Sequence, residues 1–306
     1  MIVWLPEDSV TNQTRMTAQS GTTLLPALRT CSALLLAATM TACPALAQVP
    51  QFDHVVVVVM ENHSFNDIIG ATATAPYINA LASQGANFTS SFAIEHPSEP
   101  NYLDLFSGFN QGVTDDSCPH TFDAANLGSE LIAANLTFIG YSEDLPTVAT
   151  KCTSGLYARK HNPWVNFSNV PTKSNLPFTK FPSDFSTLPT LAFVVPNLCN
   201  DTHDCSITTG DTWLSVNIDA YAQWAKVHNS LLVLTWDEDD RSQSNQIPTL
   251  FVGALVIPGN YNESIDHFRV LATLETMYGL ALTGSAADRS AVTDVWDQVV
   301  FSDGFE

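Results

Sequence analysis

The feature that most constrains this chain is the apolar run His54–Met60, which contains five consecutive valines. Valine is β-branched, and a run that is apolar at every position predicts a strand buried on both faces. Strands of that kind belong to parallel sheets that are covered by helices. The polar residues Glu61 and Asn62 follow at once. They should therefore lie at the carboxyl end of the strand, where open α/β sheets bind ligands.

The same pattern occurs again at Leu231–Trp236, an apolar run that leads into four acids at Asp237–Asp240. Two buried strands that both end in oxygen-bearing side chains predict a metal site at the sheet edge. Carboxylate and carboxamide oxygens suit Mg²⁺, Ca²⁺ or Mn²⁺. The alternative is that these acids are solvated loop residues.

Apolar runs and helical patterns alternate along the rest of the chain. We expect further strands at 88–94, 137–141, 191–195 and 251–257, and helices at 76–84, 98–106, 127–135, 211–227 and 267–278. This order predicts an α/β fold with a doubly wound, mostly parallel sheet and helices on both faces. Residues 142–188 are rich in Pro, Asn, Ser and Phe and should form an irregular loop or cap.

The N-terminal region has the pattern of a secretory signal peptide. Arg29 precedes an apolar stretch at 32–40, and Ala45-Leu46-Ala47 supplies small residues for cleavage. We therefore assign residues 1–47 to a signal peptide region and expect a secreted or periplasmic protein. A lipid anchor on Cys43 is the alternative.

The remaining domain boundaries follow from this assignment. Met16 is the expected start, with residues 1–15 an upstream extension, and a single domain should cover 48–300. The tail at 301–306 has no assigned role. No stretch reaches the roughly 20 apolar residues that a membrane-spanning helix needs.

The chain is strongly acidic, with 11 Lys and Arg against 31 Asp and Glu and a net charge of −20. Such a surface repels nucleic acid and anionic membranes at long range, so we expect no nucleic-acid partner. An anionic substrate remains compatible with this charge where a cation or a basic cluster neutralises the site.

Four cysteines follow the signal region: Cys118, Cys152, Cys199 and Cys205. An even number in an exported chain favours two disulfides over free thiols. Three connectivities are possible. The short polar loop between Cys199 and Cys205 favours pairing those two, and hence Cys118 with Cys152.

Ser98 is expected at the start of a helix, within the segment His96–Tyr102. A helix N-terminus offers unpaired N–H groups and partial positive charge, which together can bind a phosphate. A metal that lowered the pKa of the serine hydroxyl would make Ser98 a nucleophile toward phosphorus. The alternative is an ordinary capping serine.

Other segments could contact a phosphate. Arg159–His161 is a cluster of adjacent basic side chains in a loop, which could clamp an anion. Asp201, His203 and Asp204 follow the third apolar strand, and a histidine there could be a metal ligand, a proton shuttle or a phosphate contact. His267 opens the last helix, where it could be a cap or a ligand. Solvated surface side chains are the alternative in each case.

Taken together, these segments resemble the phosphoesterase family, which contains bacterial acid phosphatases and phospholipases C within the alkaline-phosphatase-like superfamily. The resemblance rests on Glu61–Phe65, His96–Tyr102 and Thr235–Asp240, and extends to 157–161 and 163–171. It covers roughly residues 52–296 and is greatest to the small secreted acid phosphatases. It implies an alkaline-phosphatase-like fold.

The resemblance also implies roles for individual residues. The implied metal ligands are Glu61, Asn62, Ser98, Asp237 and Glu238. The implied catalytic residues are Ser98, as a nucleophile that forms a phosphoseryl intermediate, with His161 and His203. We assign phosphate binding to Lys160, Asp204 and His267. Relatives can carry two Asp residues where this chain has Asp237-Glu238, and the Cys199/Cys205 pair is also a departure.

The expected function is that of an exported, metal-dependent phosphomonoesterase, an acid phosphatase acting on phosphoinositides or other organic phosphate esters. Its substrate would be a small phosphate ester or a phospholipid headgroup, and its cofactor a divalent cation. A phospholipase C-like phosphodiesterase is the alternative among enzymes. A metal-stabilised binding protein on the same fold is the alternative outside enzymes.

Overall fold

The computed structural model describes residues 49–147 and 151–297. The strands in these ranges are β1 His54–Met60, β2 Ala86–Phe88, β3 Ser91–Phe92, β4 Phe138–Ser142, β5 Thr153–Ser154, β6 Tyr157–Ala158, β7 Asn175–Pro177, β8 Leu191–Val195, β9 Ser230–Trp236, β10 Thr249–Gly253, β11 Gly259–Tyr261 and β12 Ile265–Asp266. Among the described residues, eight strands form one sheet in the order β11-β2-β10-β9-β1-β8-β4-β7. β3 pairs with β12, and β5 with β6.

The sheet is mostly parallel, as predicted. β1 lies in its interior and pairs in parallel with β8 on one side and β9 on the other. β4 and β7 continue the parallel arrangement beyond β8. β10 runs antiparallel to both β9 and β2, so it is an exception inside an otherwise doubly wound sheet.

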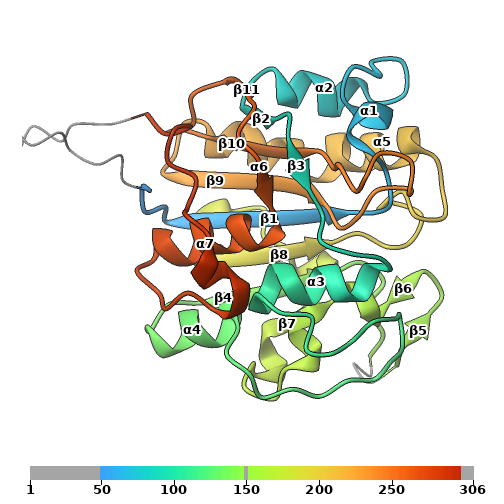
Figure 1. The fold of residues 1–306 in the computed structure, drawn as a ribbon, viewed down its shortest axis with the longest axis vertical. Coiled ribbons are helices and arrows are strands. Elements are labelled where there is room, and N and C mark those ends of the chain that lie inside the picture. The colour runs from blue at the N-terminus through green and yellow to red at the C-terminus, as the bar shows by residue number, and fades with distance from the viewer. Residues whose placement is uncertain (1–48, 148–150, 298–306) are drawn as a thin grey trace, which may run out of the picture. The chain divides into compact units, whose positions relative to one another are not determined.

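Helices cover both faces of the sheet (Figure 1). They are α1 Phe65–Ile68, α2 Pro76–Ala82, α3 Ser98–Ser107, α4 Leu127–Ala133, α5 Ile207–Asn217, α6 Asp219–Ala225 and α7 His267–Met277. Val55, Val57 and Val59 pack in one core with α3, α4 and α7, whereas Val56 and Val58 pack in the other core with α2, α5 and α6. Successive side chains of a strand point to opposite faces, which explains why the run is apolar at every position.

Two predicted strands do not extend over their whole predicted range in the structure. The strand expected at 88–94 is divided into β2 and β3, because the chain turns at Thr89–Ser90 and leaves the main sheet. The strand expected at 251–257 is β10, which ends at Gly253. A Cβ atom at Gly253 would lie 2.4 Å from the Ser230 carbonyl oxygen, so this close approach requires glycine.

The helix expected at 211–227 begins earlier and is interrupted. α5 starts after Ser206, whose side chain accepts a hydrogen bond from the Thr209 amide. Ile218 ends α5 and precedes α6. Asp211 does not start the helix; its carboxylate accepts hydrogen bonds from the Tyr77 and Ile78 amides at the start of α2.

The segment 142–188 is irregular, as predicted, but it also contributes to the sheet. It contains β5, β6 and a series of short 3-10 helices, and β7 forms the edge of the sheet beside β4. The predicted signal region 1–47 and tail 301–306 lie outside the described residues. Among the described residues, no helix has both the length and the apolar character needed to cross a membrane.

Gly140 in β4 provides a test of how the sheet positions this irregular segment. A Cβ atom at Gly140 would lie 2.1 Å from Cε2 of the buried Trp164, three residues after His161. We expect Gly140→Ala to lower the free energy of unfolding by about 1–3 kcal/mol through overpacking. Chemical denaturation would measure this loss. Gly259→Ala is the control, since its nearest neighbour would lie at 3.5 Å, and equal losses in both variants would contradict the packing argument.

Candidate active site

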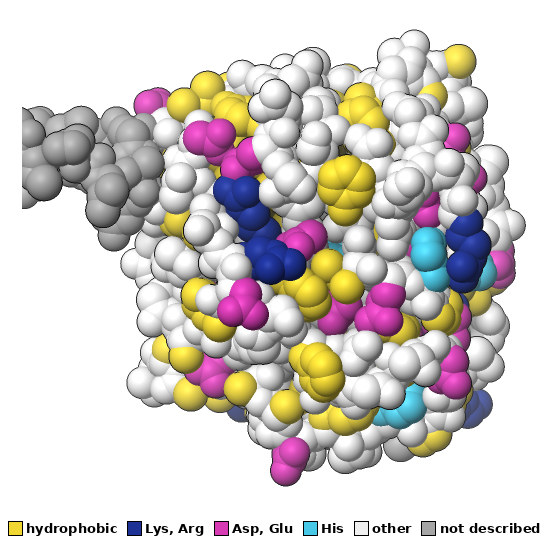
Figure 2. All heavy atoms as spheres, in the orientation of Figure 1, with side chains coloured by type: hydrophobic (Ala, Val, Ile, Leu, Met, Phe, Trp, Pro, Cys, Tyr) yellow, Lys and Arg dark blue, Asp and Glu magenta, His cyan; other side chains and the backbone are white. Residues whose placement is uncertain are grey.

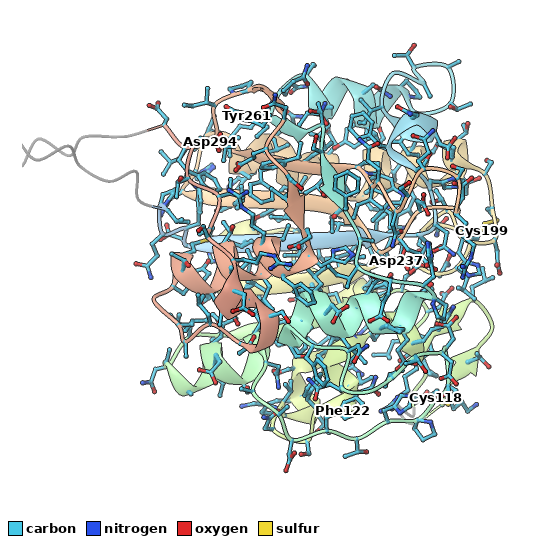
Figure 3. All side chains as sticks on the ribbon, in the orientation of Figure 1. Cys118, Phe122, Cys199, Asp237, Tyr261 and Asp294 are labelled. Atoms are coloured by element: carbon cyan, nitrogen blue, oxygen red, sulfur yellow. A yellow bond between two sulfur atoms is a disulfide. The ribbon has the colours of Figure 1, made fainter. Side chains whose placement is uncertain are left out.

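The site begins with the pairing of β1 and β9. These strands run parallel with Met60 opposite Trp236, so Glu61-Asn62 and Asp237-Glu238 leave the sheet side by side. The Asn62 amide N–H donates to Asp237 Oδ1 at 3.2 Å, and the Asp237 N–H donates to the Met60 carbonyl at 3.0 Å. Figure 3 shows Asp237 beyond the strand ends, near the start of α3. The predicted meeting of the two strand ends is therefore present.

Asn62 lies between two carboxylates. Its backbone has a left-handed φ of 47°, which asparagine tolerates better than most residues. Its side-chain amide lies 3.1 Å from Asp237 Oδ1 and 2.9 Å from Glu61 Oε2, and with its nitrogen toward them it donates to both. If the side-chain oxygen of Asn62 points toward the two carboxylates instead, it and one oxygen from each carboxylate come together. A bound cation requires such a group of oxygens.

Ser98 is the first residue of α3, and Pro97 precedes it at the cap position. Ser98 is therefore a helical residue and not the capping residue. Its hydroxyl lies 3.2 Å from Glu61 Oε2 and 3.1 Å from Glu238 Oε1, and either carboxylate can accept its proton. Ser98 is thus buried between one acid from each strand end, and the capping alternative does not describe its side chain.

Tyr102 lies one helical turn after Ser98 and faces the same acids. Its hydroxyl donates to Glu61 Oε1, and its ring stacks on His161 with centroids 5.1 Å apart and an interplanar angle of 13°. Burial raises the pKa of Tyr102 well above its usual value, so it remains a donor. Sequence reasoning missed this residue, although the spacing of four from Ser98 places both on one helix face.

His161 and Asp201 complete the far side of the acid cluster. His161 Nε2 lies 3.2 Å from Glu61 Oε1, and Nδ1 lies 3.4 Å from Asp201 Oδ2. Neither His161 Nε2 nor Asp201 Oδ2 has a hydrogen-bond partner among the described residues, although both atoms are buried. One ligand atom from each of Glu61, His161 and Asp201 lies within 4.8 Å of the other two. The residues fit a cation, because a cation would satisfy these buried atoms.

The charges in this cluster also indicate a cation. Burial raises the pKa of Glu61 well above its usual value, with Asp237 and Asp201 as further causes. Burial and then Glu238 raise the pKa of Asp237 to about 8. The pKa of Asp201 is raised as well, chiefly by burial. A divalent cation would favour the ionised form of all three acids.

The protonated form of His161 is disfavoured. Burial lowers its pKa well below the usual value, and the neighbouring Lys160 and His203 lower it further. The hypothesis that His161 protonates a leaving group needs the opposite shift. A neutral imidazole is instead the form that binds metals.

Glu238 differs from the other acids in its partners. Its Oε1 faces Ser98, while its Oε2 contacts His96 Nδ1. His96 Nε2 lies 3.4 Å from Asp239 Oδ1. His96 was included in the sequence motif but was given no role, and only the fold brings it to Glu238.

The remaining predicted phosphate contacts are less direct. His203 and Asp204 pair at the rim, with Nδ1 and Oδ1 2.7 Å apart. His267 is buried, and its Nε2 donates to the Asp237 carbonyl at 2.6 Å, while Asp266 rather than His267 caps α7. His267 therefore holds the backbone of Asp237, and this contact provides no support for phosphate binding.

Lys160 reaches the site from the 3-10 helix Arg159–His161. Its Nζ donates to Asp116 Oδ2 at 2.7 Å, and the other oxygen of Asp116 accepts from the Glu99 amide at 3.0 Å. One of the N–H groups expected to be free at the start of α3 is thus engaged by Asp116. In the space-filling view, histidine and basic side chains lie beside acidic ones near the edge to which β1 points (Figure 2).

Both disulfides have the favoured pairing, Cys118–Cys152 and Cys199–Cys205. The second closes a loop that contains Asp201 and His203. The Asp201 carbonyl accepts from the Glu61 N–H at 2.8 Å, so this loop is fastened to the end of β1.

Comparisons with known proteins identify the family of this chain. The sequence profile of the Phosphoesterase family matches residues 71–281. A phosphatidylinositol-3-phosphatase of Mycobacterium tuberculosis is 54% identical over 273 residues, which cover 87% of this chain and 91% of that protein. An acid phosphatase of Aspergillus fumigatus is 30% identical over 247 residues, covering 74% of this chain and 54% of the fungal protein.

The fold also matches solved structures. An alkaline phosphatase superfamily protein from Vibrio parahaemolyticus superimposes with a TM-score of 0.57 at 13% identity, covering 80% of this chain and 72% of that one. The phosphonate monoester hydrolase of Silicibacter pomeroyi has a TM-score of 0.54 at 10% identity, covering 79% and 76%. The predicted alkaline-phosphatase-like fold is confirmed.

The acid cluster makes a testable prediction about pH and metal. Because the pKa values of Glu61, Asp201 and Asp237 are raised by folding, these groups stabilise the metal-free fold at low pH, and that stability is lost as pH rises through the raised pKa values, which for Asp237 is about 8. A divalent cation should therefore raise the Tm more near pH 8 than near pH 5, where it must displace protons.

Thermal unfolding with and without added Mg²⁺, Ca²⁺ or Mn²⁺ would measure this difference. Asp237→Asn should lose most of the metal-dependent rise in Tm. Asp53→Asn is the control, because Asp53 is exposed at the opposite end of β1. If the added metal raised the Tm of Asp237→Asn as much as that of the control, this would show that the acid cluster does not bind the metal.

Proposed function

The chain belongs to the phosphoesterase family and is a hydrolase of phosphate ester bonds, and we propose that it is a metal-dependent phosphomonoesterase with Ser98 as its nucleophile. One observation carries the proposal: the Ser98 hydroxyl lies 3.2 Å from Glu61 and 3.1 Å from Glu238, at the start of a helix. A nucleophile needs a nearby base, and the helix start favours the negative charge of a phosphate.

The chemistry divides into two displacements. Ser98 Oγ forms a bond to phosphorus as the ester P–O bond breaks, and the serine proton passes to the carboxylate of Glu238. His203 gives a proton to the leaving oxygen. A water molecule then attacks the phosphoseryl group and gives a proton to His203, the Oγ–P bond breaks, and Glu238 returns its proton to Ser98. This sequence releases an alcohol and inorganic phosphate.

The metal would be held by the acid cluster. Glu61 and Asp237 offer carboxylates, Asn62 a carbonyl oxygen, and His161 and Asp201 further ligand atoms, with Glu61 common to both sides. When bound, a divalent cation neutralises negative charge on a phosphoryl group and lowers the pKa of a nearby hydroxyl. Tyr102 fixes the orientation of Glu61, and His267 fixes the backbone of Asp237.

His203 is the better placed of the two predicted proton donors. It lies at the rim, with its ring centroid 5.9 Å from that of His161, whereas His161 is buried with a lowered pKa. The hydrogen bond that His203 donates to Asp204 uses Nδ1, which leaves Nε2 of His203 for a leaving-group oxygen. We therefore assign leaving-group protonation to His203 and metal binding to His161.

The relatives and the disulfides support the proposed substrate and location. The 54% identity to a phosphatidylinositol-3-phosphatase supports a phosphoinositide or a related phosphate monoester as substrate. Two disulfides support an exported protein. Lys160 supplies a cation for the phosphate in an otherwise acidic chain. A phospholipase C-like phosphodiesterase remains the alternative, and release of phosphocholine from phosphatidylcholine would reveal it.

Removal of the nucleophile should abolish turnover. We expect Ser98→Ala to lower kcat for para-nitrophenyl phosphate by at least about a thousandfold, as for other covalent nucleophiles. Rapid quenching with labelled substrate should find phosphoserine in the wild-type protein alone. Ser107→Ala, at the other end of α3, is the control and should retain activity. Turnover in Ser98→Ala above a tenth of the wild-type rate would exclude the covalent mechanism.

Replacement of His203 and replacement of His161 should have different effects on kcat for the two kinds of substrate. His203→Ala should reduce kcat more for an inositol or sugar phosphate than for para-nitrophenyl phosphate, because a poor leaving group depends more on protonation. His161→Ala should instead reduce metal content and affect both substrates equally. His228→Ala is the control, since this ring stacks on Trp224 at the surface. Equal losses for both substrates in His203→Ala would argue against the proton-donor role.

A further inference from the structure

Asp116 has an unusual pair of partners beside the nucleophile. Its Oδ1 accepts from the backbone N–H of Glu99, the residue after Ser98, at 3.0 Å. Its Oδ2 accepts from the ammonium of Lys160, the residue before His161, at 2.7 Å. One exposed carboxylate thus bridges two donors that come from opposite sides of the site.

Both donors belong to the proposed phosphate site. The Glu99 amide lies at the positive end of α3, one residue from the reacting hydroxyl. Lys160 lies close enough to the acid cluster for its positive charge to oppose the burial that raises the pKa values of Glu61 and Asp201. These are the donors that an incoming phosphoryl oxygen would meet.

We propose that Asp116 is an internal competitor of the substrate and thereby sets the affinity for phosphate esters. Its two carboxylate oxygens bridge Lys160 and the Glu99 amide as two phosphate oxygens would, and the substrate must displace them. The proposal rests on the proposed function, because it assumes that the phosphate binds at Ser98.

The environment of Asp116 makes this exchange feasible. Its side chain is 33% exposed, against 19% for Lys160, so the carboxylate can return to water at small cost. It lies in the segment between α3 and α4, which Cys118–Cys152 ties to the chain just before β5 and so keeps near Lys160. Cys118 is labelled in Figure 3, below the start of α3 in that view.

The neighbouring Glu99 does not replace Asp116 in this role. Burial raises the pKa of the Glu99 carboxyl to about 8, and Asp116 is the second cause of that shift. Its Oε1 accepts from Asn166 Nδ2 at 3.0 Å, which directs this oxygen into the protein.

The test is a double-mutant cycle on the metal-loaded protein. Inorganic phosphate binding is measured by calorimetry, and KM with para-nitrophenyl phosphate, for wild type, Asp116→Asn, Lys160→Ala and the double variant. Asp116→Asn removes the charge and one of the two acceptor oxygens, and we expect it to lower both Kd and KM by roughly two- to fivefold, as for an exposed ion pair. Lys160→Ala should raise both, and should abolish most of the effect of Asp116→Asn.

Asp115→Asn is the matched control. Asp115 is the adjacent acid, and its Oδ1 accepts a local bond from the Ser117 amide at 3.0 Å, which asparagine can keep. It should leave Kd and KM unchanged. If Asp115→Asn lowered Kd and KM as much as Asp116→Asn, the effect would come from the loss of a negative charge in general. That result would overturn the proposal.

A rise in Kd or KM in Asp116→Asn would also overturn it, because Asp116 would then hold Lys160 in place for the substrate. Failure of the proposed function gives a different result. A wild-type protein without phosphomonoesterase activity would contradict that function, whereas the phosphate titration would still report whether Asp116 competes for these donors.

Discussion

The structure depends on the burial of like charges at the ends of two adjacent parallel strands. The pairing of β1 with β9 in one register brings Glu61 and Asp237 together just beyond the ends of the two strands. Carboxylates in such a place must bind protons or a cation, since burial penalises their ionised forms. The raised pKa values of both groups express this requirement. The apolar cores on both faces provide the stabilisation that keeps the acids in place.

The rest of the site is arranged around that requirement. α3 places Ser98 and Tyr102 on one face, so the proposed nucleophile and the phenol that orients Glu61 come from a single rigid element. The loop between Cys199 and Cys205 brings Asp201 to the same acids, and the 3-10 helix brings His161. Elements far apart in sequence thus supply the potential ligands, while hydrogen bonds from neighbouring groups hold their orientation.

The charge of the protein gives the few basic groups near the site a large effect. In a chain with a net charge of −20, Lys160 lies beside the acid cluster and is itself paired with Asp116. A bound cation and Lys160 would together offset the repulsion that an anionic substrate meets at this surface. Acidic residues can then tune affinity by their position, because a carboxylate and a phosphate compete for the same kinds of donor.

The sequence by itself determined the main buried strands, their alternation with helices along the chain in an α/β fold, and the acids that follow β1 and β9. Periodicity, β-branching and the position of polar residues after apolar runs are local properties, so they can be read without coordinates. Only the tertiary structure decided the antiparallel direction of β10, the roles available to Tyr102, His96 and Asp116, and the burial of His161 and His267. These depend on which side chains meet across long sequence separations. The pKa of a histidine, or the partner of a lysine, is set by neighbours that no local pattern contains.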